Sequence, residues 1–568
     1  MSLKNTPTEF DAIVVGTGIS GGWAAKELTE KGLKTLVLER GRDVKHIDDY
    51  TTMNNDPWDY PTGEVITQEA RERQPKQSRT GYTTTESRKH FFVDDIDHPY
   101  NEDKQFDWCR GYHVGGRSIM WGRQSYRLSN FDFEANAKEG VAVDWPIRYE
   151  DLAPWYSYVE KHAGISGEAL GLPQLPDSEF LKPMELNCVE KELKNSIASN
   201  YTDRLLTIGR TAHLTEGTKP GAGRINCQYR NRCMRGCPFG GYFSSLSSTL
   251  PMAEATGNMT LRPNSIVHEV MYDADTKRAT GVRVIDRVTK ETLEFKAKVI
   301  FLCASAVAST AILMQSKSEA FPNGMGNTSG ELGHNLMDHH FKVGASAEVE
   351  GFDDQYFTGR RPNGLYIPRF RNIGGATDQK NFLRGYGYQG GGNRGSWTET
   401  VKEMSYGAEF KNSILNPGGW TIGLNGFGET LPYHENRMYL NYDKLDQWGL
   451  PTVTFDAEIK ENELAMRVDM KQQAIEMLET AGFKNVQGFE DDYHLGLGIH
   501  EMGTARMGHD PKTSVLNKNN QVHGVPNVFV TDGACMTSAA NQNPSLTYMA
   551  LTARAANFAV EELKKMNL

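Results

Sequence analysis

The segment FDAIVVGTGISGGWAAKELTEKGLKTLVLERG, residues 10–41, decides the fold class of this 568-residue chain. It predicts an apolar strand, a glycine turn, an amphipathic helix and a second apolar strand that ends at Glu39. Gly16, Gly18 and Gly21 form a G-x-G-x-x-G pattern between the first strand and the helix, where backbone amides can approach a pyrophosphate. Glu39 stands 23 residues after the first of these glycines, a spacing that suits hydrogen bonds to a ribose. The segment therefore predicts a doubly wound α/β domain that binds a dinucleotide.

Composition and charge narrow the class of protein further. Hydrophobic residues make up 38% of the chain and charged residues 24%, as in ordinary globular proteins. The net charge of −10, without a long basic run, argues against a nucleic acid as partner. The most apolar stretch, residues 299–314, is too short for a membrane-spanning helix and predicts a strand followed by a helix. The first 15 residues lack the pattern of a secretory signal.

A second glycine-rich segment, WCRGYHVGGRSIMWG (residues 108–122), lies far from the first along the chain. Together the two segments resemble the glucose-methanol-choline (GMC) family of FAD oxidoreductases, in which the second loop cradles the flavin. The resemblance implies flavin contacts from Arg110, Gly111, Gly115, Gly116 and Ser118. Some similar oxidases carry in this loop a histidine that bonds covalently to the flavin. Because Met120 stands there in this chain, the resemblance implies noncovalent FAD.

Further blocks extend the resemblance almost to the last residue. Residues 265–298 predict a small β-meander, which precedes the buried strand 299–302 and the helix 304–315. ELGHNLMDHH (331–340) resembles a conserved segment of the family, and residues 526–563 predict a strand, a polar turn and a long helix. In the family this helix directs its N-terminus at the flavin. The resemblance thus adds three cofactor-binding residues, which are Val267, Asp532 and Pro544.

Two residues are the candidates for catalysis. Oxidation of an alcohol by a flavin needs a base for the hydroxyl proton, and histidine is the side chain best suited to that task. His500 occupies the position of the family's catalytic histidine, and Asn543 that of its partner, which holds the substrate oxygen. Asn543 is also a good N-cap for the last helix. His339 and His340 are expected to order the loop at the domain junction.

Three of the seven cysteines cluster in CQYRNRCMRGCPFG, residues 227–240. Cys227, Cys233 and Cys237 are spaced C-x5-C-x3-C, and a proline follows the last one. Structural zinc would need a fourth ligand, whereas a three-iron cluster needs three thiolates. Free thiols or a strained disulfide are the alternative. The segment resembles one in bacterial FAD-dependent sugar dehydrogenases of the glucoside 3-dehydrogenase and glucose dehydrogenase type, which implies a 3Fe-4S cluster. The remaining cysteines are predicted to be packed thiols, namely Cys109, Cys188, Cys303 and Cys535.

The predicted organisation is an FAD-binding domain interleaved with a substrate domain on an antiparallel sheet. Residues 1–127, 238–340 and 499–568 form the first domain, and residues 128–237 and 341–498 the second. The polar segment 43–107 is expected to be a lid or an interaction arm. The glycine-rich segment 383–397 is expected to be a flexible loop, either at the sugar site or on the surface.

The predicted function is oxidation of a sugar or glycoside hydroxyl, with carbon 3 of glucosides as the first expectation. Electrons would pass through the cluster to a cytochrome c subunit, and a small export subunit would carry the signal for a periplasmic location. The cytoplasm is the alternative location. Glucose 1-dehydrogenase, an oxygen-dependent pyranose oxidase and a flavoprotein electron-transfer subunit without a substrate of its own are the alternative functions.

Overall fold

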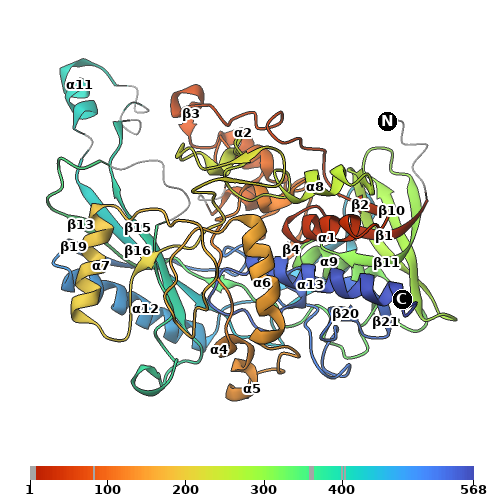
Figure 1. Ribbon diagram of the computed structural model, residues 1–568. Helices are drawn as coiled ribbons and strands as arrows, with labels where there is room; N and C mark the ends of the chain where they lie inside the picture. Colours follow the sequence, from red (N-terminus) through yellow and green to blue (C-terminus); the bar gives the residue numbers. More distant parts are fainter. Residues whose placement is uncertain (1–7, 81–83, 357–363, 398–400, 402–404, 417) are drawn as a thin grey trace.

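The computed structural model describes residues 8–80, 84–356, 364–397, 401, 405–416 and 418–568 (Figure 1). Its largest sheet has eight strands, of which six follow the order β20, β21, β11, β1, β2, β8. Strands β21, β11, β1, β2 and β8 run parallel to one another. The bounds of the six strands are β1 (Glu9–Val15), β2 (Thr35–Leu38), β8 (Met259–Arg262), β11 (Thr292–Leu302), β20 (Gln521–Val522) and β21 (Val525–Val530).

Both faces of this sheet are buried, which explains the unbroken apolar runs in its strands. On β1, Ile13 and Val15 point into one hydrophobic core, whereas Ala12 and Val14 point into another. Strand β11 alternates in the same way, with Ile300 in the first core. The prediction of a doubly wound α/β fold is confirmed.

The predicted meander is present and continues directly into the parallel sheet. Strands β9 (Ser265–Asp273) and β10 (Arg278–Asp286) pair antiparallel, and β10 pairs with the first half of β11. The second half of β11 pairs with β1 and β21. The meander and the buried strand that follows it are therefore joined in one continuous strand.

Helices cover both faces of the sheet. Helix α1 (Ile19–Glu30) packs against α8 (Thr249–Ala255) and against the last helix, α13 (Ser545–Lys564). Helix α13 also contacts α6 (Tyr149–Ala163), and α9 (Ala306–Gln315) packs on β9. In Figure 1 the red α1 and the blue α13 lie side by side, although they stand at opposite ends of the chain.

A second sheet, at the other end of the molecule in Figure 1, has seven strands that pair antiparallel. Helices α12 (Glu461–Thr480) and α7 (Cys188–Asn200) pack against it. Its strands are β19 (Lys484–Glu490), β13 (Val343–Val349), β16 (Trp420–Glu429), β15 (Tyr386–Arg394), β14 (Leu365–Ile367), β5 (Thr207–Ile208) and β12 (His339–His340). The domain boundaries stay a prediction.

The glycine-rich segment 383–397 is not a flexible loop, and that prediction was wrong. Its central part is strand β15, which lies between β14 and β16. A Cβ on Gly390 would lie 2.0 Å from the carbonyl oxygen of Gly423. The glycine lets two backbones approach closely, which composition alone does not distinguish from a flexible loop.

The described part of the segment 43–107 folds into short elements, of which β3 (Pro61–Glu64) and α2 (Gln68–Arg73) lie near the top of Figure 1 and β4 (Asn101–Glu102) lies near its centre. Strand β4 joins β17 (Arg437–Leu445) and β18 (Pro451–Asp456) in a third sheet. No helix in the described ranges is long and apolar enough to cross a membrane. The remaining elements are η2 (Pro57–Asp59), α3 (Pro75–Ser78), η3 (Lys89–Phe91), η4 (Gly116–Ile119), α4 (Asn130–Phe133), α5 (Ala135–Glu139), β6 (Thr218–Lys219), β7 (Arg224–Ile225), η5 (Cys233–Arg235), η6 (Gly375–Thr377), α11 (Gly407–Leu415) and η7 (Gly533–Cys535), where η marks a 3₁₀ helix.

Candidate active site

The three glycines of the first loop have different surroundings. Gly16 has a φ of +98°, and a Cβ there would lie 2.4 Å from the carbonyl oxygen of Cys303. A Cβ on Gly21 would lie 1.9 Å from the carbonyl oxygen of Gly16. A Cβ on Gly18, in contrast, would meet no protein atom within 4 Å. Two glycines thus permit the turn and the close packing of the helix, and the middle one leaves its backbone open to a pyrophosphate.

Glu39 lies directly after β2, beside this loop. Its carboxylate accepts hydrogen bonds from the Thr17 amide (3.2 Å), the Thr17 hydroxyl (2.5 Å) and the Gly41 amide (2.9 Å). Burial raises the pKa of Glu39 despite these hydrogen bonds. The acidic residue therefore stands at the edge where a dinucleotide-binding fold holds the ribose.

The second glycine loop contacts the first. The Gly115 amide donates to the Thr17 hydroxyl (3.0 Å). The Ser245 amide donates to the Ser118 hydroxyl (3.0 Å), and the Ser245 hydroxyl donates to the Gly18 carbonyl (2.8 Å). The structure thus brings together two loops that lie about 100 residues apart in the sequence, as their shared role requires.

Of the other residues predicted to bind the cofactor, one lies at the contact between the two loops and two have side chains that contact other parts of the protein. A Cβ on Gly116 would lie 3.3 Å from the first loop, so this residue belongs to the same contact. The Arg110 guanidinium instead donates to the Asp95 carboxylate (3.0 Å) and lies 4.5 Å from the centre of the Trp108 ring. Val267 is buried in the core on β9. The side chains of Arg110 and Val267 thus have structural contacts in this fold.

Asp532 lies directly after β21, at the carboxyl end of the parallel sheet. Its carboxylate accepts hydrogen bonds from the Ser309 hydroxyl (2.5 Å) and the Ala534 amide (3.0 Å). Burial raises the pKa of this carboxyl to about 6. This edge of the sheet is where ligands bind in open α/β folds.

The two predicted catalytic residues face each other. Asn543 Nδ2 lies 3.5 Å from His500 Nε2. Gln389 Nε2 donates to Asn543 Oδ1 (2.7 Å), which turns the amide nitrogen of Asn543 toward the imidazole. The prediction that Asn543 caps the last helix was wrong: α13 begins at Ser545, Pro544 is its N-cap residue, and no side chain caps it.

A hydrogen-bond chain fixes the tautomer of His500. His339 Nε2 lies 2.7 Å from the carbonyl oxygen of Ala540, which can only accept, so this nitrogen carries a proton. In a neutral ring His339 Nδ1 then accepts, and it lies 2.8 Å from His500 Nδ1. His500 Nδ1 must therefore donate, which leaves the lone pair of His500 Nε2 directed toward Asn543. His500 is thereby prepared to accept a proton.

Both rings are neutral because burial disfavours their charged form. Burial lowers the pKa of His339 to about 4. Burial, followed by the nearby His339 and Arg117, lowers the pKa of His500 well below its ordinary value. The Arg117 guanidinium pairs with the carboxylate of Glu501 (2.7 Å), the residue that follows His500 in the sequence. His500 is thus an unprotonated base at neutral pH.

Asp338 holds the backbone on both sides of this pair. One oxygen accepts from the amides of His339 (2.8 Å) and His500 (3.0 Å), and the other from those of Gly496 (2.8 Å) and Gly498 (2.9 Å). Burial raises the pKa of Asp338 to about 7. Asp338, His339 and Gln389 are therefore residues of the candidate active site that the sequence did not assign to it.

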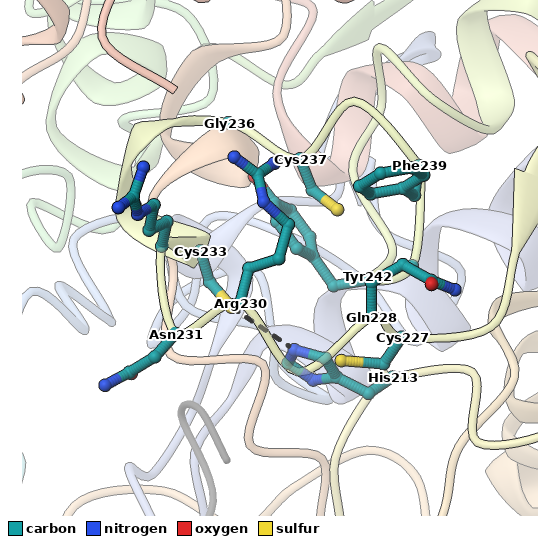
Figure 2. A pocket seen from close by; sticks show the side chains of 12 residues that line it. His213, Cys227, Gln228, Arg230, Asn231, Cys233, Gly236, Cys237, Phe239 and Tyr242 are labelled. Atoms are coloured by element: carbon teal, nitrogen blue, oxygen red, sulfur yellow. Dashed lines mark hydrogen bonds between the residues drawn. The ribbon is translucent and has the colours of Figure 1, made fainter. Parts of the chain in front are cut away.

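The clustered cysteines line one small cavity together with a histidine from outside the motif (Figure 2). His213 Nε2 lies 3.7 Å from the Cys233 sulfur, and Cys227 and Cys237 line the same cavity. In the part of the chain that the structure describes, no two cysteines are joined by a disulfide, so the disulfide alternative was wrong. Burial raises the pKa of the Cys227 thiol to about 11. No group of three or more His, Cys, Asp or Glu side chains in the described residues is placed to hold a metal ion.

Arginines of the cysteine loop clamp it onto the segment 43–107. Arg232 donates to the Asn54 carbonyl (2.6 Å) and Arg235 to the Asn55 carbonyl (2.6 Å). Arg232 also pairs with Asp56. This part of the segment, which the sequence predicts as a lid or an arm, supports the thiol cavity.

Fold and site together define a flavin-dependent oxidoreductase: two glycine loops in contact, an acidic residue after β2, and a neutral histidine paired with an amide. Two models of the GMC oxidoreductase family match residues 10–341 and 432–552. The chain belongs to the GMC oxidoreductase family.

Similar proteins act on alcohols and sugars. The chain is 27% identical to 2-methyl-1,2-propanediol dehydrogenase of Mycolicibacterium austroafricanum, over 98% of this chain and 96% of that one. It is 24% identical to the fructose dehydrogenase large subunit of Gluconobacter japonicus, over 99% and 100%. A solved structure of Aspergillus oryzae formate oxidase shares the fold with a TM-score of 0.61 at 13% identity, covering 98% of this chain and 99% of that one.

Proposed function

We propose that this protein is a dehydrogenase with noncovalent FAD that oxidises a hydroxyl group of a sugar or glycoside. The observation that carries the proposal is the lone pair of His500 Nε2 facing the Asn543 amide at 3.5 Å. The contact between the two glycine loops, and the space beside Gly18, fit the pyrophosphate and flavin of FAD. Met120, at the position of the covalent histidine in some similar oxidases, has no side chain able to form that bond.

The site residues divide the work on the substrate hydroxyl. Asn543 Nδ2 donates to the substrate oxygen, held in place by the hydrogen bond from Gln389. His500 Nε2 accepts the hydroxyl proton. The resulting imidazolium still donates a hydrogen bond from its Nδ1 to His339 Nδ1. When bound, FAD supplies an acceptor for the hydride that leaves the carbon atom bearing this hydroxyl group. The positive charge on His500 is transient, because burial favours release of the proton to solvent.

Sugars are the substrate class because the relatives that span the whole chain include the large subunit of fructose dehydrogenase. The half-buried Gln389 adds an amide beside the catalytic pair that suits a polyhydroxylated substrate. Carbon 3 of a glucoside stays the predicted position. Identification of the product by NMR, as a 3-keto sugar or as a lactone, decides between this position and carbon 1.

We further propose that Cys227, Cys233 and Cys237 hold a 3Fe-4S cluster that passes electrons to a one-electron acceptor such as a cytochrome c subunit. The support is that three thiols from one short loop line the same cavity, with a proline after the last one. A cluster of iron and sulfide spaces its thiolates farther apart than a single ion does. Three thiols that line one cavity without being placed to hold a single metal ion are therefore compatible with such a cluster.

The test starts from protein purified without oxygen. Iron content and the EPR spectrum report the cluster, and dye reduction across a panel of sugars reports the activity. H500Q should abolish sugar-dependent dye reduction while FAD stays bound. The matched control is H509Q, because the His509 side chain is 65% exposed and far less constrained. Unchanged sugar-dependent dye reduction in H500Q would overturn the role of His500 as the base. Absence of sugar-dependent dye reduction from the unaltered protein would leave a flavoprotein without a substrate of its own. Peroxide formation by iron-free protein would indicate an oxidase.

A further inference from the structure

Two fully buried arginines beside the thiol cavity have no carboxylate partner in the described part of the chain. Arg123 is 0% exposed and Arg224 is 1% exposed. In the cysteine loop itself, Arg232 pairs with Asp56 and Arg235 with Glu64, whereas the less buried Arg230 donates to the Met53 carbonyl and the Asn54 side chain. Buried charges are normally paired, because an isolated one costs several kcal/mol. Two buried cations without a matching anion indicate that a negative group belongs beside them.

Arg123 links the cofactor loop with the cysteine loop. Its Nη2 donates to the carbonyl of Ile119 (2.9 Å), in the second glycine loop, and to the carbonyl of Cys233 (2.7 Å). Its Nη1 lies 3.4 Å from the Met234 sulfur, and the guanidinium stacks on the Tyr242 ring at 3.8 Å. All of these partners are neutral. These neutral groups fix the position of the Arg123 guanidinium, but none of them carries a negative charge that would neutralise it.

Arg224 lies against the end of the cysteine loop. It donates to the carbonyls of Gly240 (3.2 Å) and Ala163 (2.9 Å). Burial lowers its pKa to about 10, and the Cys237 thiol is the acidic group that opposes this shift. The other titratable groups that line the cavity are His213 and Tyr242, which burial keeps neutral, and the cations Arg230 and Arg232. The cysteines alone can supply negative charge here.

We infer that Arg123 sets the reduction potential of the group held by the three cysteines, because its buried and unbalanced charge stabilises added negative charge in the cavity. The inference rests on the proposed cluster. Three thiolates and a cluster carry net negative charge, which increases by one when the cluster takes up one electron. A fixed cation favours that more negative, reduced state. Its removal must therefore lower the reduction potential.

The experiment is an EPR-monitored redox titration with dithionite and mediators on the complete protein. R123M removes the charge and keeps an unbranched side chain, and R123K keeps the charge but loses the two-pronged contact. R232M is the matched control: it removes a charge from the same loop, but Arg232 is 26% exposed and already paired. We expect R123M to lower the equilibrium constant for one-electron reduction at least tenfold, which is about 59 mV. R123K and R232M should shift it much less.

Each outcome has a defined meaning. Equal shifts in R123M and R232M, or no shift in either, would overturn the inference while leaving the cluster established. Absence of iron from the unaltered protein would instead overturn the proposed function. If R123M cannot retain iron, retention by R123K supports the same charge balance. Loss of iron from both would assign Arg123 to the folding of the loop and overturn its electrostatic role.

Discussion

Replacement of His339 by leucine should slow substrate oxidation by about 100-fold, although His339 lies behind His500 and not at the substrate. The leucine removes the acceptor that holds the proton on His500 Nδ1. If only orientation suffered, the loss would be one hydrogen bond of about 0.5–1.5 kcal/mol, or roughly two- to thirteen-fold. If the proton moved entirely to Nε2, the base would be lost, at a cost of about 10² to 10⁴. If His500 in H339L populates both tautomers, the loss of rate falls between these two limits, at about 100-fold.

The measurement is single-turnover reduction of the flavin by substrate, with kcat and KM from dye reduction. H339N is the matched control, because its side-chain oxygen can take the place of Nδ1 as acceptor, and it should recover most of the lost rate. The effect should fall on kcat and on flavin reduction, with KM changed less than about threefold. Equal rates in H339L and H339N would refute the tautomer argument, and so would full activity in H339L.

Three further predictions follow from packing and burial. G18A should weaken FAD binding without changing the melting temperature of the FAD-free protein, whereas G21A should lower that temperature because its Cβ would clash at 1.9 Å. G390A should destabilise the second sheet, and G423A, whose Cβ would meet nothing within 4 Å, should not; chemical denaturation compares them. Stability should fall as pH drops from about 6.5 toward 4. His113 has its pKa lowered to about 4 by burial, so the unfolded chain binds a proton that the folded one refuses, at up to about 1.4 kcal/mol per pH unit. Unfolding at several pH values measures this slope, and a flat profile would contradict it.

Much of the cofactor-binding fold could be predicted because its signals are local. The alternation of Ile13 and Val14 between two cores requires an apolar run, and the run is visible in the sequence. The glycine turn follows from steric limits at Gly16, which no other residue type meets as readily. The pairing of His500 with Asn543 was predictable through resemblance, since nothing local to His500 distinguishes it from the other histidines. Their catalytic roles stay a prediction.

The rest depends on contacts between distant segments. His339 and His500 stand 161 residues apart, so no spacing rule connects them. Gln389 belongs to a glycine-rich strand that looks like a loop in the sequence, because close backbone packing and flexibility call for the same residue. Asn543 has the side chain of a good helix cap, but tertiary contacts direct it to His500 instead. A local preference was outweighed by partners from elsewhere in the chain.

The parallel pairing of β11 with β21 has a consequence for biosynthesis. Strand β11 ends at Leu302 and β21 begins at Val525, so one edge of β11 waits for a partner made about 220 residues later. At about 5–20 residues per second, translation takes roughly 10 to 45 s to supply it. Helix α13, which covers α1, is made later still. During that interval the nascent chain exposes an apolar strand edge and an uncovered helix, which makes it a natural client for chaperones that bind such segments.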